Sequence, residues 1–174
     1  MTVLPESLLV GHVAGLAVSP LDPPTRERLA QALLDWFTAG WSGARAPLAD
    51  RFRAVAMDCH PGAGPAPTFG GAVTSVPAAA FANGAIAHIR EIDDAHRAAM
   101  LHPGVVAVTP VMALAYDGRL TRRRMADAVL AGYEVALRVG EAMGTRHAAG
   151  FHATATAGTL GAAAASAMAL GLSD

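Results

Sequence analysis

Two segments in the second half of the chain carry small residues at the spacing of a helix turn. In the first segment, Gly132, Ala136 and Gly140 follow one another four residues apart. A second set, within residues 154–170, consists of Gly158, Gly161, Ala162 and Ala165. Residues three or four apart share a helix face, and a face without bulky side chains lets another helix approach closely. The pattern predicts two helices that pack against each other or against a second copy of themselves.

The overall composition also favours helices. Hydrophobic residues make up 53% of the chain and aromatic residues only 5%. Alanine, the best helix former, supplies much of the apolar content. No segment alternates apolar and polar residues as a half-buried strand would, and no internal repeat is visible. Because 174 residues suffice for one hydrophobic core, we predict a single all-α domain over residues 1–174.

The limits of several helices follow from capping residues. Asp22, Ser75 and Thr121 each precede a helical pattern and have side chains that accept hydrogen bonds from a first helical turn. Gly144 is suited to end a helix, because glycine adopts the left-handed conformation easily. The helices predicted in this way and from apolar spacing cover residues 5–18, a segment after Asp22, and residues 48–57, 78–89, 105–116, 121–143 and 154–170.

Three further features of the pattern carry structural predictions. Pro110 predicts a kinked or broken helix. Residues 58–74, rich in glycine and proline, predict a long irregular segment that is functional or covered by a partner. An apolar stripe after Asp22 predicts core residues, namely Leu29, Leu33, Trp36 and Phe37.

The charges and residue types exclude several functions. The formal net charge is −1, and no basic stripe interleaves with aromatic residues. A nucleic acid is therefore not a predicted partner, since binding phosphates needs clustered positive charge. All 13 basic residues are arginines, so no lysine of this chain can form a Schiff base or act as a general base. Cys59 is the only cysteine, which rules out an intrachain disulfide.

The sequence also indicates where the protein resides. The first residues lack the positively charged segment of a secretory signal and carry Glu6 early. Residues 153–173 bear no charge, but they are mostly alanine, glycine, threonine and serine. Such a segment suits a buried helix of a soluble protein better than a membrane span. We expect a cytoplasmic protein that does not insert into a membrane.

Residues 88–96 carry more polar groups than a helical core needs. His88 and Glu91 lie three apart and share a helix face, and Asp93, Asp94 and His96 follow at once. Burial and neighbouring charges can move the pKa values of such groups toward neutrality, as proton abstraction requires. The alternative interpretation is a solvated helix end.

Two more histidines lie where helices are predicted to begin. His102 precedes Pro103 and a long apolar segment, a position that suits a general acid or base, or a simple cap. His152, Thr154 and Thr156 crowd the start of an alanine-rich helix. The free N–H groups and the positive end of the helix dipole favour an anion there. A carboxylate substrate fits this position, and so does capping alone.

A metal site is an alternative use of the same residues. His88, Glu91, Asp94, His96 and His102 include the types found in sites with two histidines and one carboxylate. However, the chain has no repeated Glu-x-x-His pair and no H-E-x-x-H spacing. We therefore predict no metal.

Five separated segments form a recognisable set: 79–88 (AAFANGAIAH), 91–96 (EIDDAH), 102–106 (HPGVV), 131–144 (AGYEVALRVGEAMG) and 150–165 (GFHATATAGTLGAAAA). In this order they resemble the helical domain of the MmgE/PrpD family, which includes 2-methylcitrate dehydratase and cis-aconitate decarboxylase. The resemblance implies a helical domain, a smaller α/β lid domain, an active site between them and, usually, a homodimer. It also implies cofactor-free dehydration, decarboxylation or epimerisation of small di- and tricarboxylates.

The resemblance and the local patterns together nominate site residues. We expect His102, Glu91, Asp94 and His152 to be catalytic. The residues expected to contact substrate are His88, Asp93, His96 and Thr154.

The chain departs from the family pattern at several positions. Glu91 stands where the family has aspartate, Ala95 where it has threonine and Gly104 where it has serine. The lid and the later helices, with their substrate-contacting lysines and tyrosine, have no counterpart in these 174 residues.

These observations leave three hypotheses for the function. The first is one subunit of a split lyase that removes a proton alpha to a carboxylate, with loss of water or CO₂, while a second chain supplies the missing half. The second is a non-catalytic assembly subunit or remnant. The third is a small isomerase or cyclase that dimerises with itself.

Overall fold

Seven helices and one short hairpin make up the regular structure of the described residues, 5–18 and 20–172 of the computed structural model. The helices are α1 (Pro5–Val18), α2 (Pro23–Gly43), α3 (Ala49–Cys59), α4 (Val76–His88), α5 (Pro103–Ala115), α6 (Arg122–Ala148) and α7 (Ala153–Leu170). The hairpin pairs β1 (Ala66–Pro67) with β2 (Val73–Thr74) in antiparallel fashion. The all-α prediction is confirmed.

The predicted caps begin their helices as expected. The Asp22 carboxylate accepts a 2.7 Å hydrogen bond from the Thr25 amide at the start of α2. Ser75 and Thr121 cap α4 and α6 in the same way, through hydrogen bonds of 3.4 and 3.1 Å. At Gly144 the backbone leaves the helical region (φ 65°, ψ −174°), so the regular part of α6 ends there before a last turn.

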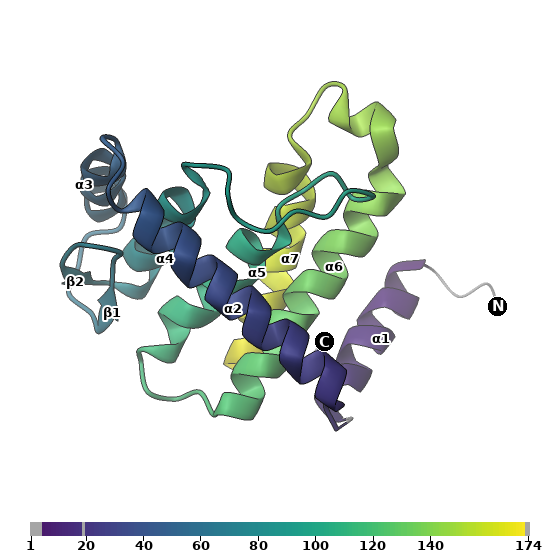
Figure 1. Ribbon diagram of the computed structural model, residues 1–174. Coiled ribbons are helices and arrows are strands. Elements are labelled where there is room, and N and C mark those ends of the chain that lie inside the picture. Colours follow the sequence, from purple (N-terminus) through teal and green to yellow (C-terminus); the bar gives the residue numbers. More distant parts are fainter. Residues whose placement is uncertain (1–4, 19, 173–174) are drawn as a thin grey trace.

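α5, α6 and α7 lie side by side (Figure 1), and the main cluster of buried residues extends from them into α2, α3 and α4. A Cβ atom built on Gly161 of α7 would lie 2.7 Å from the Ala136 Cβ atom and 2.8 Å from the Gly132 carbonyl of α6. On the other side, a Cβ on Gly158 would lie 2.7 Å from Val106 of α5. The small residues therefore allow the close approach that their spacing predicted.

α5 continues through Pro110, so of the two outcomes predicted there a break is excluded. The structure corrects one core prediction. Phe37 is not a core residue: it is 36% exposed, whereas Trp36 beside it is 3% exposed. Phe37 instead packs edge-on against Trp36, with ring centres 5.0 Å apart. The irregular segment 58–74 contains the short hairpin.

One helix of the described residues, α7, is long and apolar enough to cross a membrane by length and composition alone. A buried helix of a soluble protein passes the same test. The glycine face of α7 is covered by α5 and α6, which agrees with the predicted role as a core helix.

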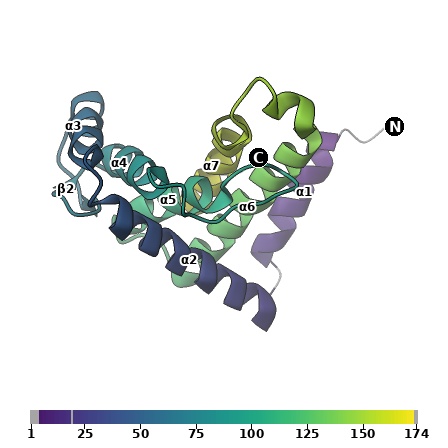
Figure 2. The same cartoon turned by 45° about the horizontal axis from the view of Figure 1, so that its top comes forward.

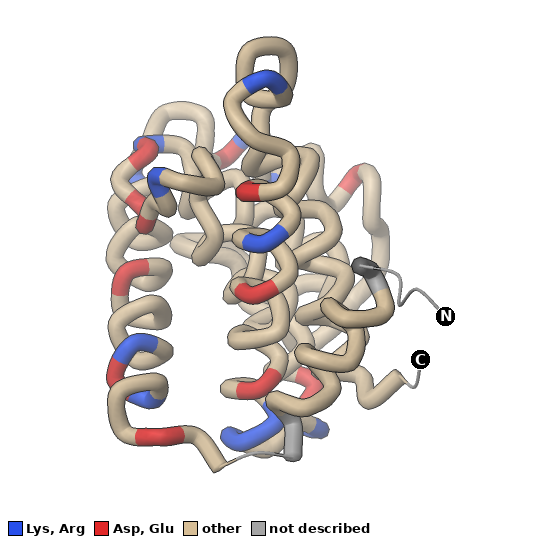
Figure 3. Tube along the Cα trace, turned by 90° about the vertical axis from the view of Figure 1, so that its right-hand side faces the viewer, with Lys and Arg blue, Asp and Glu red and all other residues tan. Residues whose placement is uncertain are grey.

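The remaining helices frame this core. α1 lies along α6 at one end of the molecule, α3 lies at the other, and α2 crosses between them (Figures 1 and 2). A groove of about 750 Å³ separates α1 from α6 and is lined by Leu8, Leu9, Val139 and Met143, among others. Acidic and basic residues are interspersed on the face shown in Figure 3 and form no single-sign stripe.

Candidate active site

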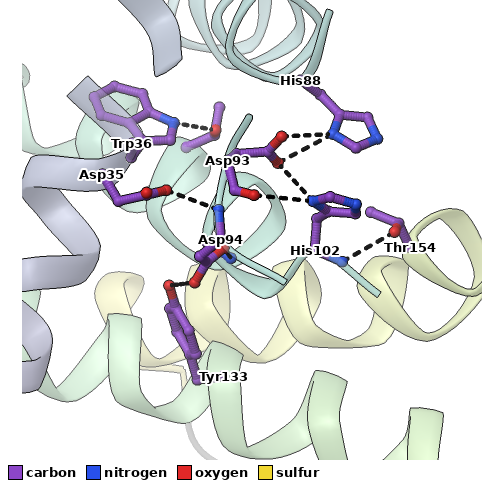
Figure 4. Close-up of polar contacts among 10 residues, drawn as sticks. Asp35, Trp36, His88, Asp93, Asp94, His102, Tyr133 and Thr154 are labelled. Carbon is purple, nitrogen blue, oxygen red and sulfur yellow. Dashed lines mark hydrogen bonds and ion pairs between the residues drawn. The ribbon is translucent and has the colours of Figure 1, made fainter. Parts of the chain in front are cut away.

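The polar segment between α4 and α5 turns back on itself. His96 and Leu101 form an isolated antiparallel bridge that closes the tip of the turn. Glu91 has a φ of 49°, in the left-handed region that a residue with a long side chain rarely adopts. Its amide donates to the His88 carbonyl at 3.0 Å, so the chain reverses immediately after α4. This reversal places Asp93 beside both His88 and His102 (Figure 4).

Asp93 is the centre of the site. Its side chain is only 1% exposed, and its carboxylate lies 3.0 Å from His88 Nδ1 and 3.5 Å from His102 Nδ1. His102 Nδ1 also lies 3.2 Å from the Asp93 carbonyl oxygen. A carbonyl can only accept, and an ionised carboxylate can only accept. Both histidines must therefore carry a proton on Nδ1, which leaves Nε2 of each ring as the atom that exchanges a proton.

The pKa of His88 is raised above its ordinary value. The main cause is the hydrogen bond to Asp93, and the charges of Asp93 and Glu91 add to it, while partial burial acts in the opposite direction. His88 therefore keeps its positive charge to a higher pH than a free imidazole.

His102 and His152 each lie at the start of a helix. His102 is the N-cap residue of α5, and its backbone N–H donates a 3.1 Å hydrogen bond to Thr154 Oγ1 at the start of α7. His152 is the N-cap residue of α7, and its ring centre lies 6.0 Å from that of His88. The rings of His88 and His102 are 4.8 Å apart. Three predicted site histidines are therefore brought together.

Asp94 points away from these histidines. Its carboxylate accepts a 2.6 Å hydrogen bond from the Tyr133 hydroxyl and a 2.8 Å hydrogen bond from the Gly104 amide in the first turn of α5. The pKa of Asp94 is raised, mainly by burial and further by the charges of Asp35 and Asp93, although each of these hydrogen bonds acts to lower it. The same burial, with the charge of Asp94, raises the pKa of the Tyr133 hydroxyl. This geometry makes Asp94 a residue that holds the turn and α5 in place.

The other nominated residues lie at the edge of the cluster or outside it. Glu91 is exposed on the turn, and its negative charge helps to raise the pKa of His88. His96 Nδ1 accepts a 3.2 Å hydrogen bond from the Ala99 amide and lies 3.9 Å from Glu141. Thr154 is 5% exposed, and its hydroxyl oxygen accepts the hydrogen bond from the His102 backbone N–H.

Two residues that the patterns did not nominate support the turn. Asp35 of α2 accepts a 2.8 Å hydrogen bond from the Asp94 amide. Tyr133 of α6 holds the Asp94 carboxylate. Tyr133 follows Gly132 in α6 but lies on a different side of the helix from the small residues, so its pattern gave no signal for this contact. Asp35 had no signal either.

The cluster suits two kinds of chemistry. Two imidazoles that share a buried carboxylate can accept and deliver protons at Nε2. His88, Asp93 and His102 also each offer one ligand atom for a metal ion, and these atoms lie within 4.8 Å of one another. His152 is the N-cap residue of α7, and its side chain forms no capping hydrogen bond with the first turn of that helix.

Comparisons with known proteins agree with this architecture. Residues 8–174 match the model of the MmgE/PrpD N-terminal domain. The chain is 29% identical over 136 residues to cis-aconitate decarboxylase of Aspergillus terreus, and equally to the protein of its strain NIH 2624 / FGSC A1156. The match covers 75% of this chain and 28% of the length of each relative. On the strength of the domain match, this chain belongs to the MmgE/PrpD family.

Proposed function

We propose that this chain carries the proton-transfer groups of a lyase acting on a small carboxylate, and that a further polypeptide closes the site above them. The observation that carries the proposal is the pair of imidazoles, His88 and His102, that shares the buried carboxylate of Asp93. The decarboxylase relatives supply the reaction class, since decarboxylation is the activity in their name.

His102 is the base of the proposed reaction. Its Nδ1 proton is held by Asp93, so Nε2 has the lone pair that removes a proton from the carbon alpha to a substrate carboxylate. The buried charge of Asp93 stabilises the imidazolium that results. A positioned general base of this kind contributes about 100- to 10,000-fold to the rate.

His88 is the acid of the proposed reaction. Its raised pKa, caused mainly by the hydrogen bond to Asp93, keeps its proton in place to a higher pH than in an ordinary imidazole. In a dehydration this proton goes to the leaving hydroxyl, which departs as water. In a decarboxylation no alpha proton is removed: the carbon–carbon bond to the carboxylate breaks, CO₂ leaves, and the electron pair left on carbon takes a proton from the His88–Asp93–His102 cluster.

The start of α7 is the proposed place for a substrate carboxylate. The first turn of α5 already holds the carboxylate of Asp94, whereas no side-chain cap is formed by His152 at the start of α7. An anion is favoured at such a helix start by its N–H groups and dipole. His152 lies beside His88 there, so a carboxylate bound at α7 would place its alpha carbon near the acid and the base.

Exposure of the cluster argues for a covering polypeptide. The side chains of His88 and His102 are each 24% exposed, and His152 is exposed. Electrostatic catalysis gains strength when water is excluded. The relatives are longer, with only 28% of their length matched. In a split enzyme the cover would be a second chain, and a homodimer partner is the other candidate. The intact histidine cluster favours this proposal over a non-catalytic assembly role.

The test is turnover of cis-aconitate and 2-methylcitrate by this chain, alone and with whatever polypeptide co-purifies from the native host. NMR of the reaction mixture distinguishes decarboxylation from dehydration. We expect turnover only in the complex, and we expect His102→Asn to reduce kcat by at least about 100-fold. His60→Asn, which changes an exposed histidine outside the cluster, is the matched control and should leave turnover unchanged.

Each alternative has its own outcome. Unchanged turnover of the complex with His102→Asn would support a non-catalytic subunit. High activity of the isolated, self-associated chain would instead support the self-dimerising enzyme and remove the need for a second polypeptide.

A further inference from the structure

We propose that His88, Asp93 and His102 form a binding site for a divalent transition-metal ion such as Zn²⁺, and that the bound ion switches the cluster off. The binding part of this inference depends only on the geometry of the three side chains. The inhibitory part rests on the proposed function. The ion is therefore a regulator and has no part in the chemistry.

The three ligand atoms already lie at distances that suit one small ion. The Asp93 Oδ2 atom is 3.0 Å from His88 Nδ1 and 3.5 Å from His102 Nδ1, and all three atoms lie within 4.8 Å of one another. In a tetrahedral zinc site, bonds of roughly 2.0–2.1 Å place neighbouring ligand atoms about 3.3 Å apart. The two distances from the Asp93 oxygen to the imidazole nitrogens are already close to this value.

The elements that carry these ligands are well held. His88 ends α4 and His102 begins α5, and the backbone of His102 is tied to Thr154. The Asp93 side chain is 1% exposed, so its charge is poorly solvated and gains from a cation. A site whose ligands are in place before binding loses little conformational freedom when the ion enters.

The type of ion follows from the ligands. Two imidazole nitrogens and one carboxylate oxygen suit Zn²⁺ and its neighbours, whereas Mg²⁺ and Ca²⁺ prefer oxygen alone. The imidazoles are 24% exposed, so an ion can reach them from solvent. The ring centre of His152 lies 6.0 Å from that of His88, outside the group of three ligand residues.

The ion would disable the cluster because it takes the atoms that Asp93 uses. Binding at Nδ1 replaces the Nδ1 protons of His88 and His102 and breaks the hydrogen bond from His102 to the Asp93 carbonyl. The bound cation then neutralises the Asp93 charge, so this charge no longer stabilises an imidazolium. A substrate carboxylate at the start of α7 would also meet the ion instead of a free His88.

The spacing along the sequence predicted no metal because His88, Asp93 and His102 match no helical metal motif. The cluster arises only when the turn after α4 folds back (Figure 4). The sequence pattern also nominated Asp94 as a ligand in place of Asp93, and the structure shows that Asp94 points elsewhere.

The experiment is a titration of the metal-free chain with ZnCl₂ by calorimetry, without substrate, supported by the visible absorption of the Co²⁺ form. We expect one ion per chain. We expect His102→Ala and Asp93→Asn each to weaken binding at least about 100-fold, since even an outer partner of a ligand is worth 10- to 100-fold. His60→Ala and His12→Ala remove histidines outside the cluster and should leave binding unchanged.

The outcomes separate this inference from the proposed function. Circular dichroism identifies any variant that fails to fold, and Asp93→Asn keeps the shape of the side chain if His102→Ala does not fold. Zinc binding that survives both variants, or that His60→Ala abolishes, would overturn the metal site. Zinc binding that follows the prediction in a chain without lyase activity in any complex would leave the site standing and remove only the inhibitory role.

Discussion

Thr154 Oγ1 accepts a 3.1 Å hydrogen bond from the backbone N–H of His102, and this contact joins the start of α7 to the start of α5 across 52 residues of sequence. His152 lies two residues before Thr154. The contact therefore sets the distance between two of the three clustered histidines.

Replacing Thr154 with valine should destabilise the protein and disturb His102. Valine has the shape of threonine without the oxygen, so the partly buried His102 amide would lose this acceptor. We expect a loss of about 1–3 kcal/mol in the free energy of unfolding, measured by urea denaturation. Thr154→Ser keeps the oxygen and should lose less. Equal losses in both variants would show that the methyl group matters and the hydrogen bond does not.

Replacing Tyr133 with phenylalanine should weaken the turn through Asp94. The lost hydrogen bond to this partly buried carboxylate costs about 1–3 kcal/mol at neutral pH. Because this bond lowers the Asp94 pKa, its loss should raise that pKa further. A buried carboxyl with a raised pKa is stabilised in its protonated form, so stability falls as the pH rises through the folded pKa. The deficit of the variant should thus be larger at pH 7 than at pH 4.

The exposed tyrosine provides the control for this experiment. Tyr116 is 44% exposed, and Tyr116→Phe should change the unfolding free energy little at either pH. If the loss in unfolding free energy caused by Tyr133→Phe does not depend on pH, the hydrogen bond from Tyr133 to Asp94 is not the contact that stabilises the protein.

The helix starts could be predicted because capping is local. Asp22, Ser75 and Thr121 each bond an amide three residues ahead, so the signal lies within one turn of sequence. The close packing of α6 on α7 was also predictable, because small residues at helical spacing leave a flat face that a neighbouring helix can cover closely.

The arrangement of side chains within the site was not predictable, because it depends on contacts between residues far apart in the sequence. The sequence nominated Asp94 as catalytic and the adjacent Asp93 as a substrate contact, yet the turn places the Asp93 carboxylate beside the two histidines and the Asp94 carboxylate on Tyr133. Tertiary structure sets the partners of Asp94: Tyr133, 39 residues away, donates to its carboxylate, and Asp35, 59 residues away, accepts from its backbone amide. The left-handed backbone of Glu91, which directs this turn, is equally invisible in a sequence pattern.

The close approach of α6 and α7 makes a strong prediction for Gly161. An added methyl group would lie 2.7 Å from the Ala136 Cβ atom and 2.8 Å from a backbone oxygen, so the helices must move apart. We expect Gly161→Ala to cost about 1–3 kcal/mol in thermal or urea unfolding, although alanine favours a helix over glycine. Gly11→Ala in α1, where nothing lies within 4 Å, should be neutral or stabilising by up to about 1 kcal/mol. Similar effects at both positions would contradict the packing described.

The hydrogen bond between His88 and Asp93 predicts a pH dependence that NMR can follow in the metal-free chain. The His88 pKa should lie above the ordinary value of 6.5, mainly because of Asp93. Asp93→Asn removes the negative charge, so the His88 pKa should fall, and it should fall below 6.5 if burial then dominates. The Cε1–H signal of His88, titrated in both proteins, measures the change.

The raised pKa of His88 also determines how its contribution to the free energy of unfolding changes with pH. A histidine whose folded pKa is raised binds its proton more tightly in the native state, so its contribution is fully present below the unfolded pKa, near 6.5. The contribution disappears as the pH rises through the folded pKa. The difference in unfolding free energy between the native chain and His88→Gln should therefore be larger at about pH 5.5 than at about pH 9. A difference that grows with pH would mean that His88 is held neutral in the folded protein, and the acid role proposed for it would have to pass to another group.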